Sequence, residues 1–333
     1  MKIFENSVIF ITGGTGSFGQ AFIQATLKHF NPKKIIVYSR DEMKQWSMAE
    51  KLNKYKSKLE FIIGDIRDIQ RLDMVTKGVD YIVHAAATKI VPTAEENPIE
   101  CIKTNVMGSM NLLSCAVNNN VKKLVALSTD KASSPINLYG ASKLCADKLF
   151  SSGNNLKIGQ TTKISVVRYG NVMGSRGSVI PFFLKIPKNE KIPITDLEMT
   201  RFMISLNDAI NLVWIAFKDM TGGEIYVKKI PSMKITEIAK AINPKSKFKI
   251  IGIRPGEKIH EQMIGKDDSY STYEYKDYYK IFPTSFKMTK KIIKDGKKVS
   301  KGFYYSSENN KNWMTSDQLK KWLKINSRKF LEI

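Results

Sequence analysis

Short apolar runs rich in β-branched residues alternate with longer amphipathic segments through the first half of the chain. We expect a helical stretch of ten or more residues after each of the first five runs. Strands separated by helices pair in parallel, so this order predicts an α/β fold with a doubly wound parallel sheet. Ligands of such sheets bind beyond the carboxyl ends of the strands. The expected strands are Val8–Thr12, Lys34–Ser39, Leu59–Ile63, Tyr81–Ala85, Leu124–Ser128 and Ile164–Arg168.

The composition excludes several classes of protein. With 42% hydrophobic and 26% charged residues, the chain is neither disordered nor collagenous. Its densest apolar stretch, Ala209–Phe217, is interrupted by Asn211 and is shorter than the ~18 residues that a transmembrane helix needs. The apolar start of the chain leads directly into a glycine motif, which indicates a first strand rather than a signal peptide. We therefore expect a cytoplasmic protein with no membrane partner.

Neither the cysteines and histidines nor the net charge indicates a further kind of site. The net charge is +23, and the 54 basic residues comprise 46 Lys and 8 Arg spread along the chain. A nucleic-acid binder concentrates its basic residues on one face, so dispersed lysine indicates a solvated surface rather than a nucleic-acid site. The charge is compatible with phosphate-bearing small molecules. The cysteines lack the spacing of a disulfide framework, and the cysteines and histidines lack the spacing of metal ligands, so we expect no metal site. These residues are Cys101, Cys115, Cys145, His29, His84 and His260.

A glycine-rich turn follows the first apolar run. Gly13, Gly16 and Gly19 recur every three residues in GGTGSFG, and a helical pattern begins at Ser17. Glycines let the backbone approach a pyrophosphate, and the start of a helix supplies free N–H groups and the positive end of the helix dipole. This strand–turn–helix context predicts a dinucleotide site in a Rossmann-like fold. Two other residues of the turn, Thr15 and Phe18, are also predicted to contact the dinucleotide.

The end of the second run bears on the choice between NAD and NADP. An NAD site commonly has an acidic residue there, about 20 residues after the glycines, which binds the ribose 2′-hydroxyl. Here Ser39 and Arg40 stand at that point, and Lys44 follows one helical turn later, so a 2′-phosphate and NADP are predicted. A register shift of one or two positions would let Asp41 serve NAD instead. Glu42 and Met43, which lie between Asp41 and Lys44, are also predicted to bind the cofactor.

The third run is followed by Asp65 and Ile66, which we include in the predicted cofactor site. A carboxylate at this position can accept a hydrogen bond from the adenine amino group. It can equally cap the next helix. The sequence leaves both roles open for Asp65.

A candidate catalytic group follows the fifth run. Tyr139 and Lys143 lie four residues apart in YGASK, which places them on one face of a helix. A nearby lysine cation favours phenolate, which makes a tyrosine a usable base at neutral pH. Thr129, at the end of the fifth run, can hydrogen-bond the same substrate hydroxyl. The arrangement predicts a catalytic site made of these three residues.

The regular alternation fades after Arg168. Gly174–Gly177 and several prolines predict loops, which are followed by a helix over Leu206–Asp219 and a strand over Glu224–Val227. We predict an NADP-binding Rossmann domain over residues 1–168 and a mainly substrate-binding lobe over residues 169–333. The segment of about 206–230 is expected to return to the first domain and pack on its sheet.

Taken together, the motifs resemble the extended short-chain dehydrogenase/reductase family. TGGTGSFG, the His84-Ala85-Ala86-Ala87 strand end and YGASK occur in the order of that family. Longer segments resemble its inverting UDP-N-acetylglucosamine 4,6-dehydratases of the pseudaminic acid type. These segments are YSRDEMKQ, GDIRD, HAAATKIVPTAEENPIECIKTN, LSTDKASSPINLYGASK, RYGNVMGSRGSVIPFF, MTRF and GIRPGEKIHE. The resemblance covers nearly the whole chain and is weakest from about Ser269 to Lys301.

The resemblance implies a reaction with no net redox change. Tyr139 would take the proton of the sugar 4-hydroxyl while C4 is oxidised, and the resulting ketone acidifies the C5 proton. Lys131 would remove that proton, and Asp130 would protonate the departing 6-hydroxyl. Retaining relatives have an Asp-Glu pair at this point, so Lys131 is the distinguishing residue. A lysine base must be neutral, and Asp130, Lys143 and burial would set its charge.

Further site residues are carried over from the same resemblance. Lys89 would contact the cofactor or the substrate, although ATKIVP departs slightly from the family's usual AALKHVP. Arg254 suits a diphosphate because its fork can pair with two oxygens. Arg201, in MTRF, is equally consistent with a structural role. The predicted substrate set comprises Ala85, Lys89, Thr129, Asp130, Asn171, Arg254 and Glu257. The predicted cofactor set is completed by Tyr139, Lys143 and Val172.

The expected activity is therefore that of an NADP-dependent UDP-N-acetylglucosamine 4,6-dehydratase, a lyase that inverts C5 on the route to pseudaminic acid for surface glycosylation. Another sugar-nucleotide enzyme such as a 4-epimerase would need the 4-ketone but no acid–base pair for C5 and C6. A regulatory NADP- or nucleic-acid-binding protein that has lost catalysis is disfavoured by the intact set of Thr129, Tyr139 and Lys143. We also expect a homo-oligomer.

Overall fold

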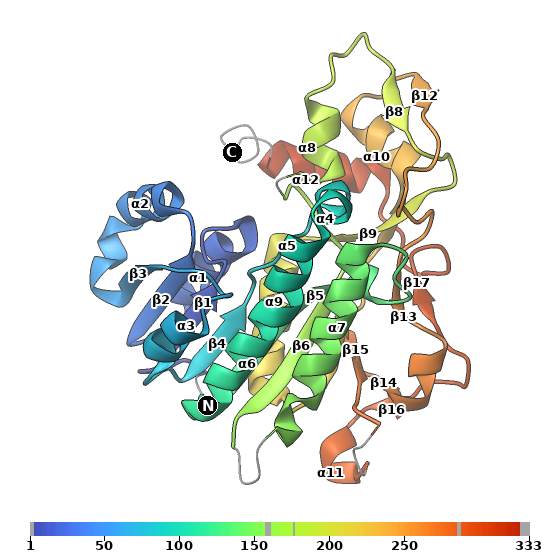
Figure 1. Ribbon diagram of the computed structural model, residues 1–333. Helices are drawn as coiled ribbons and strands as arrows, with labels where there is room; N and C mark the ends of the chain where they lie inside the picture. The colour runs from blue at the N-terminus through green and yellow to red at the C-terminus, as the bar shows by residue number, and fades with distance from the viewer. Residues whose placement is uncertain (1–2, 157–160, 176, 285–287, 327–333) are drawn as a thin grey trace.

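A ten-stranded sheet passes through the molecule in the computed structural model, which describes residues 3–156, 161–175, 177–284 and 288–326 (Figure 1). Its parallel part has the order β3-β2-β1-β4-β5-β6-β10. The winding reverses between β1 and β4, which is the doubly wound arrangement predicted from the sequence. These strands are β1 (Val8–Thr12), β2 (Lys34–Ser39), β3 (Leu59–Ile63), β4 (Tyr81–His84), β5 (Lys123–Thr129), β6 (Lys163–Tyr169) and β10 (Ile225–Lys228).

The first six strands lie where the sequence predicts them. β1 to β3 have the predicted bounds, β4 ends one residue early, and β5 and β6 are one residue longer at each end. The expectation of at least ten helical residues after every strand is wrong after β3. There α3 (Ile69–Thr76) has eight residues, because Gly78, with φ +74°, turns the chain into β4.

Helices cover both faces of the sheet (Figure 1). On one face α1 (Ser17–His29) packs against α9 (Leu206–Asp219), which has the predicted bounds and contacts β5 and β6. On the other face α3, α6 (Gly108–Asn118) and α7 (Leu138–Ser152) pack side by side. The other helical segments of this part are α2 (Glu42–Lys51), η1 (Asn53–Lys58), α4 (Val91–Glu96), α5 (Pro98–Ile102), η2 (Lys103–Met107), η3 (Asp130–Ala132) and η4 (Gly153–Asn155).

The sheet continues beyond the parallel strands with segments that the sequence analysis assigned to the second lobe. β15 (Tyr278–Ile281) pairs antiparallel with β10, and β14 (Thr272–Glu274) and β16 (Lys297–Lys298) follow. These strands are two to four residues long, too short for a periodic pattern to show. Lys280 of β15 is buried in this edge and forms an ion pair with Asp219.

A smaller lobe with its own hydrophobic core lies at the top of Figure 1. Its core includes Ile180, Phe183, Met203, Ile238 and Leu319. Position 176, in the predicted Gly174–Gly177 loop, lies outside the described residues. The elements outside the large sheet are α8 (Val179–Leu184), α10 (Ile235–Ile242), η5 (Asp267–Ser271), α11 (Lys290–Ile293), α12 (Ser316–Asn326), the sheet of β7 (Asn171–Val172), β9 (Thr200–Ile204) and β11 (Ser232–Lys234), and the pairs β8 (Ile192–Ile194) with β12 (Phe248–Ile250) and β13 (Gln262–Ile264) with β17 (Tyr305–Ser306).

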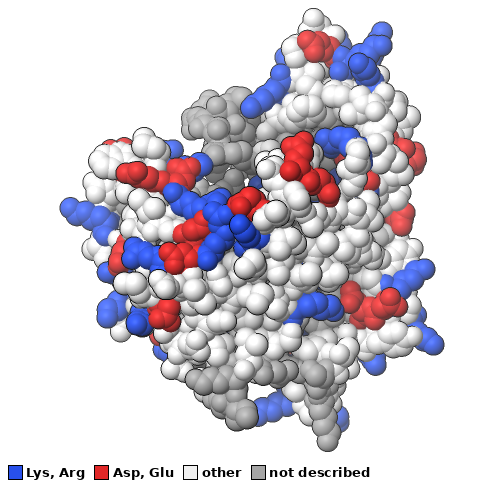
Figure 2. All heavy atoms as spheres, in the orientation of Figure 1, with Lys and Arg blue, Asp and Glu red and all other residues white. Residues whose placement is uncertain are grey.

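The surface and the helices bear on the classes of partner. On the face shown in Figure 2, Lys and Arg side chains are interspersed with Asp and Glu rather than gathered in one basic field. Among the described residues, no helix combines the length and the apolar character that crossing a membrane requires.

Candidate active site

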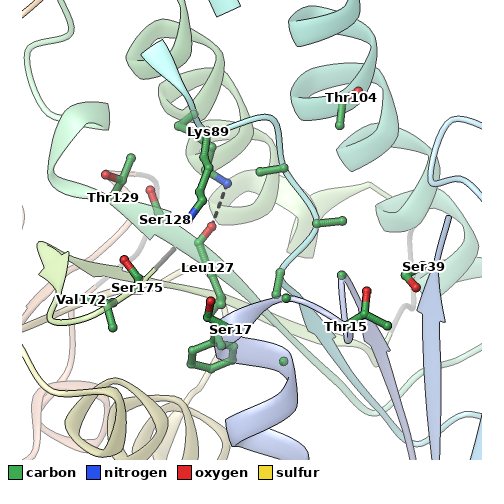
Figure 3. Close-up of a pocket in the computed structure, with 18 of the residues that line it drawn as sticks. Thr15, Ser17, Ser39, Lys89, Thr104, Leu127, Ser128, Thr129, Val172 and Ser175 are labelled. Atoms are coloured by element: carbon green, nitrogen blue, oxygen red, sulfur yellow. Dashed lines mark hydrogen bonds between the residues drawn. The ribbon is translucent and has the colours of Figure 1, made fainter. Parts of the chain in front are cut away.

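A cavity of about 790 Å³ follows the carboxyl ends of the parallel strands. In Figure 3, Thr15 and Ser39 lie toward one end of it, and Ser128 and Thr129 lie toward the other. The structure thus brings most of the predicted site residues together. Those that line the cavity are Gly13, Thr15, Gly16, Ser17, Phe18, Gly19, Ser39, Arg40, Asp41, Lys44, Asp65, Ile66, Ala85, Lys89, Thr129, Asp130, Lys131, Tyr139, Lys143, Asn171 and Val172.

Four predicted site residues do not line this cavity: Glu42, Met43, Arg254 and Glu257. Glu42 and Met43 lie in the first turn of α2, where the Met43 side chain is 70% exposed. Arg254 donates two hydrogen bonds, at 2.9 and 2.7 Å, to the carboxylate of Glu257. The fork expected to bind a diphosphate is therefore engaged by a carboxylate in this structure.

The turn between β1 and α1 forms a cradle at one end of the cavity. Gly13 has φ +65°, and a Cβ atom there would lie 2.8 Å from the backbone nitrogen of Ala86. Gly16 precedes α1 and provides no side-chain cap for the first turn of the helix. An anion at this point would meet main-chain N–H groups and the positive end of the helix dipole. The cradle fits the pyrophosphate of a dinucleotide.

Basic and hydroxyl groups gather at the end of β2. The Arg40 side chain is 61% exposed and its guanidinium lies 3.6 Å from Asp65. Asp41 caps α2 by accepting a hydrogen bond from the backbone N–H of Lys44, and it also forms an ion pair with the Lys44 ammonium. Asp41 thus has a structural role in this register. A 2′-phosphate at this end would meet Ser39, Arg40 and Lys44.

Asp65 is not the cap of the next helix. Asp68 caps α3 by accepting from the backbone N–H of Arg71, whereas Asp65 accepts hydrogen bonds from the Arg67 guanidinium at 2.9 and 2.6 Å. Burial acts to raise the pKa of Asp65, but Arg67 and Arg40 outweigh it and lower that pKa. The capping alternative is wrong, and Asp65 presents an ionised carboxylate to the cavity.

Tyr139, the predicted base, is fixed by the start of α7. Asn137 caps this helix by accepting from the backbone N–H of Gly140 at 2.7 Å. Gly140 permits a close approach, since a Cβ atom there would lie 2.3 Å from the carbonyl oxygen of Lys131. Tyr139 is thereby held beside the end of β5, where it lines the cavity together with Thr129. Thr129 was predicted to hydrogen-bond the substrate hydroxyl, and it lines the same cavity as Tyr139.

The cation that acts most strongly on Tyr139 is Lys131 rather than Lys143. Burial raises the pKa of Tyr139 to about 12, against the charge of Lys131 and the hydrogen bond with Thr129, which lower it. The ammonium of Lys143 donates to the carbonyl oxygen of Leu127 at 2.7 Å, and burial lowers the pKa of this lysine. The charge that acts most strongly on the phenol thus comes from Lys131 of η3 (Asp130–Ala132), and the role of Lys143 toward the phenol stays a prediction.

Lys131 lies between two carboxylates. Its Nζ is 3.2 Å from Oδ1 of Asp130 and 2.9 Å from Oε1 of Glu261. Burial acts to lower the pKa of Lys131, but these two carboxylates outweigh it and raise the pKa. The lysine is an ammonium at neutral pH. Its charge was expected to depend on Asp130 and Lys143; the structure puts Glu261 in the place of Lys143.

Arg201 and Glu261 lie behind Lys131 and outside the cavity lining, at the end of the cavity where the catalytic residues are predicted. Arg201 is buried and donates to the backbone carbonyls of Thr200, Lys258 and Ile259. This supports the structural interpretation of Arg201, because its contacts fix the segment that carries Glu261. Sequence reasoning missed Glu261, although it ends the quoted segment GIRPGEKIHE. Glu261 could have been identified from the sequence, because it is a carboxylate in a motif from which Arg254 and Glu257 were already predicted to be site residues.

Comparisons with known proteins agree with this geometry. Residues 9–283 match the polysaccharide biosynthesis protein family. The chain belongs to that family. One relative, the inverting UDP-N-acetylglucosamine 4,6-dehydratase of Campylobacter jejuni, is 50% identical over 327 residues, which cover 95% of this chain and 97% of that one. The UDP-glucose 4-epimerase of Rickettsia rickettsii is 42% identical over 319 residues, covering 93% of each chain.

Solved structures show the same architecture. The structure of Pen from Bacillus thuringiensis has a TM-score of 0.89 and 34% identity to the present chain. The match covers 98% of the present chain and 99% of Pen. A dTDP-glucose 4,6-dehydratase from Streptomyces venezuelae, DesIV with NAD and TYD bound, has a TM-score of 0.68 and 23% identity, covering 76% of this chain and 86% of that one. The second likeness shows the Rossmann-type fold alone. Within the described ranges, no three His, Cys, Asp or Glu side chains are grouped so that they could hold a metal ion.

Proposed function

We propose that this protein is an NADP-dependent UDP-N-acetylglucosamine 4,6-dehydratase, a lyase that inverts C5 of the sugar. The observation that carries the proposal is the placement of Asp130 and Lys131 next to Tyr139 at the end of β5. An epimerase needs the tyrosine alone, whereas removal of water across C5 and C6 also needs a base and an acid. The 50% identity to a dehydratase with that name along nearly the whole chain supports the same conclusion.

The residues of the cavity fit a dinucleotide. The glycine cradle and the uncapped start of α1 suit a pyrophosphate, Asp65 suits the adenine amino group, and Lys143 and Tyr139 suit the nicotinamide end. When bound, the oxidised nicotinamide would accept a hydride from C4, return it to C6, and favour the phenolate of Tyr139 through its positive charge.

NADP is favoured over NAD by the charges at the end of β2. Arg40 and Lys44 line the cavity together with Ser39, and a phosphate accepts charge-assisted hydrogen bonds from such groups. Asp41, the carboxylate that could serve NAD, caps α2 and pairs with Lys44. These contacts leave the exposed Arg40 guanidinium as the main candidate for a 2′-phosphate.

Tyr139 would perform the first proton transfer. As phenolate it takes the proton of the 4-hydroxyl while C4 is oxidised, and Thr129, which lines the cavity together with Tyr139, orients the same hydroxyl. The ketone that results makes the proton on C5 acidic. This step depends on the tyrosine being a base, which burial opposes in this structure by raising its pKa to about 12.

Asp130 and Lys131 would perform the elimination. Lys131 in its amine form removes the C5 proton, and Asp130 in its acid form protonates the departing 6-hydroxyl, which leaves as water. Burial raises the pKa of Asp130, with the charge of Lys131 acting against it, so this carboxyl is suited to hold a proton. Hydride would then return to C6 while the Lys131 ammonium, after exchange with solvent, gives a proton to the opposite face of C5, which inverts the configuration of C5.

The direct test is incubation of the protein with UDP-N-acetylglucosamine and NADP, followed by identification of the sugar product by NMR. We expect a 4-keto-6-deoxy sugar with inverted C5. Recovery of unchanged substrate with either NADP or NAD would contradict the proposal. The Tyr139→Phe variant is the control for product that arises without the protein's own chemistry.

A 4-epimerase is the second candidate, because relatives with 42% identity carry the name UDP-glucose 4-epimerase. Its product would keep the 6-hydroxyl and differ from the substrate only at C4. The same NMR experiment distinguishes the two activities, since only the dehydratase product has a C6 methyl group.

The proposal extends to the setting of the reaction. A 4-keto-6-deoxy N-acetylhexosamine with inverted C5 is suited to pseudaminic acid synthesis and surface glycosylation, and both proposed small molecules are cytoplasmic metabolites. A homo-oligomer is supported by large apolar side chains exposed on neighbouring helical segments, namely Ile99, Ile102, Met107 and Met110. Sedimentation velocity measures the oligomer, and a monomer at micromolar concentration would contradict that part.

A further inference from the structure

A second carboxylate contacts the proposed C5 base from outside the β5 motif. Glu261 lies just before β13 and is 2% exposed, and its Oε1 is 2.9 Å from the Nζ of Lys131. Asp130 contacts the same ammonium at 3.2 Å. The remaining oxygens, Oδ2 of Asp130 and Oε2 of Glu261, are buried and have no hydrogen-bond partner among the described residues. Two buried carboxylates therefore share one lysine.

The two carboxylates have different surroundings. Glu261 also faces Arg201, whose Nε lies 3.9 Å from its Oε1. Burial acts to raise the pKa of Glu261, but Lys131 and Arg201 outweigh it and lower that pKa. For Asp130, burial prevails and raises the pKa, and the charge of Glu261 adds to it. Glu261 is thus the carboxylate that stays ionised, and Asp130 is the one that accepts a proton more readily.

Arg201 is itself held in place. Its guanidinium donates to three backbone carbonyls, at 2.7, 2.9 and 3.0 Å, and lies 3.5 Å from Glu257. The other charged or titratable groups that face the cluster are Lys258, whose Nζ donates to the carbonyl of Ser133 at 2.7 Å, and Tyr139 of α7. The fixed guanidinium makes Glu261 a fixed negative charge behind Lys131.

We propose that Glu261 is a positioning residue for the elimination, which holds the Lys131 ammonium against Asp130 and retains a negative charge there throughout the step. The inference rests on the proposed dehydratase function. One proton passes from the ammonium of Lys131 to the carboxylate of Asp130, which gives the amine and the acid that the elimination needs. The charge of Glu261 does not change in this transfer.

The elimination then balances without a proton from solvent. The amine of Lys131 takes the C5 proton and becomes ammonium, and the acid of Asp130 gives its proton to the 6-hydroxyl. The C5–H and C6–O bonds break, the C5–C6 double bond forms, and water leaves. Lys131 and Asp130 return to the charges that the structure shows. The elimination requires that Lys131 and Asp130 together keep the one proton that they share.

The pH profile of Glu261→Gln tests this role. The amide can still accept a hydrogen bond from Lys131, but the negative charge that helps to raise the pKa of Lys131 is gone. The shared proton should leave the pair at lower pH, so the alkaline limb of kcat for dehydration should move down by about one pH unit or more. KM and the transient absorbance of reduced cofactor should stay within about twofold, since C4 oxidation precedes the step.

Two further variants keep the test decisive. Glu261→Asp retains the charge, so its alkaline limb should stay at the wild-type position while kcat falls because the carboxylate is shorter. Glu308→Gln is the matched control, since Glu308 pairs with His260 rather than with Lys131, and its profile should equal that of the wild type. If Glu261→Gln fails to fold, a wild-type kcat in Glu261→Asp overturns the role.

The outcomes separate the two proposals. Wild-type protein that forms no 4-keto-6-deoxy product contradicts the proposed function itself. Wild-type protein that forms the product, together with a folded Glu261→Gln whose alkaline limb does not move, overturns only the role of Glu261. A melting temperature for each variant shows that it is folded, and a purely structural role would lower that temperature without moving the limb.

Discussion

The two ends of the cavity are built from different materials. At the cradle end, main-chain groups and the glycines of one short segment shape the site, and the charged side chains are open to solvent, with Arg40 61% exposed. At the catalytic end, Asp130 and Glu261 are 1% and 2% exposed and come from segments far apart in sequence. Solvent screens charges at the first end but much less at the second. Single substitutions should therefore have small effects at the cradle and large effects at the catalytic end.

The largest effect should follow removal of the first base. In Tyr139→Phe we expect kcat to fall by about 10³-fold or more, because the variant lacks the phenol that is proposed to take the 4-hydroxyl proton. Reduced-cofactor absorbance should disappear with it, while binding of the UDP-sugar, measured by calorimetry, stays nearly intact. Turnover near the wild-type level would show that another residue is the base.

Lys131→Ala should stop the reaction one step later. We expect dehydration to fall by about 10²-fold or more, with C4 oxidation preserved and visible as reduced cofactor. The variant also leaves two buried carboxylates without their shared cation, which costs roughly 3–5 kcal/mol of folding free energy at neutral pH. Lys234→Ala, which removes an exposed ion pair with Glu198, should change neither quantity. Equal losses in both variants would break the contrast between buried and exposed charges.

Arg40→Ala should have a modest effect at the cradle end. We expect the ratio of NAD to NADP dissociation constants to fall by about tenfold, the value of one charge-assisted hydrogen bond at a solvent-exposed site. Fluorescence titration with both reduced cofactors measures it, and NAD binding in the variant should be unchanged. Equal affinities of the unmutated protein for the two cofactors would refute the assignment of NADP.

The most gradual effect is a pH dependence of stability that is set by His84 and is spread over several pH units. His84 is buried at the end of β4, where its Nδ1 is hydrogen-bonded to the Thr12 hydroxyl at 2.8 Å. Burial, with the charge of Lys143, lowers its pKa from 6.5 to about 3. The unfolded chain takes up a proton below about pH 6.5 and the folded chain does not, so stability is full above that pH. It should fall by about 1.4 kcal/mol per pH unit as the pH drops toward 4.

Chemical denaturation between pH 7 and 4 measures this slope. His84→Asn should lose the part that His84 contributes, whereas His29→Gln, at the exposed end of α1, should keep it. A wild-type slope in His84→Asn would mean that the imidazole is protonated in the folded protein.

The same contrast explains which features could be predicted from the sequence. The glycine turn, the end of β2 and the Tyr139–Lys143 pair are local in sequence, and each follows a strand whose bounds the β-branched pattern nearly fixes. The contact of Lys131 with Glu261 is not local, because it depends on how β13 docks beside η3. The edge strands β14 to β16 were missed because runs of two to four residues show no period.

The role of a residue within a correctly placed motif could not always be predicted from the sequence. Whether Asp65 or Asp68 caps α3 depends on where the helix starts, and one turn of difference decides it. Arg254 was expected to face a diphosphate, but the three-residue spacing to Glu257 lets the two side chains pair with each other. The motifs predicted where the site lies. The partner of each charged side chain could be identified only from the folded structure.

The central claim, that Lys131 and Asp130 eliminate water with inversion at C5, is tested most directly by running the reaction in D₂O and following the first product by NMR. We predict deuterium at C5 and the L-arabino 4-keto sugar. A deuterium supplied at C4 of the substrate should appear at C6, because the hydride stays internal. A D-xylo sugar as the first species formed would contradict the account and would place the protein with the retaining dehydratases.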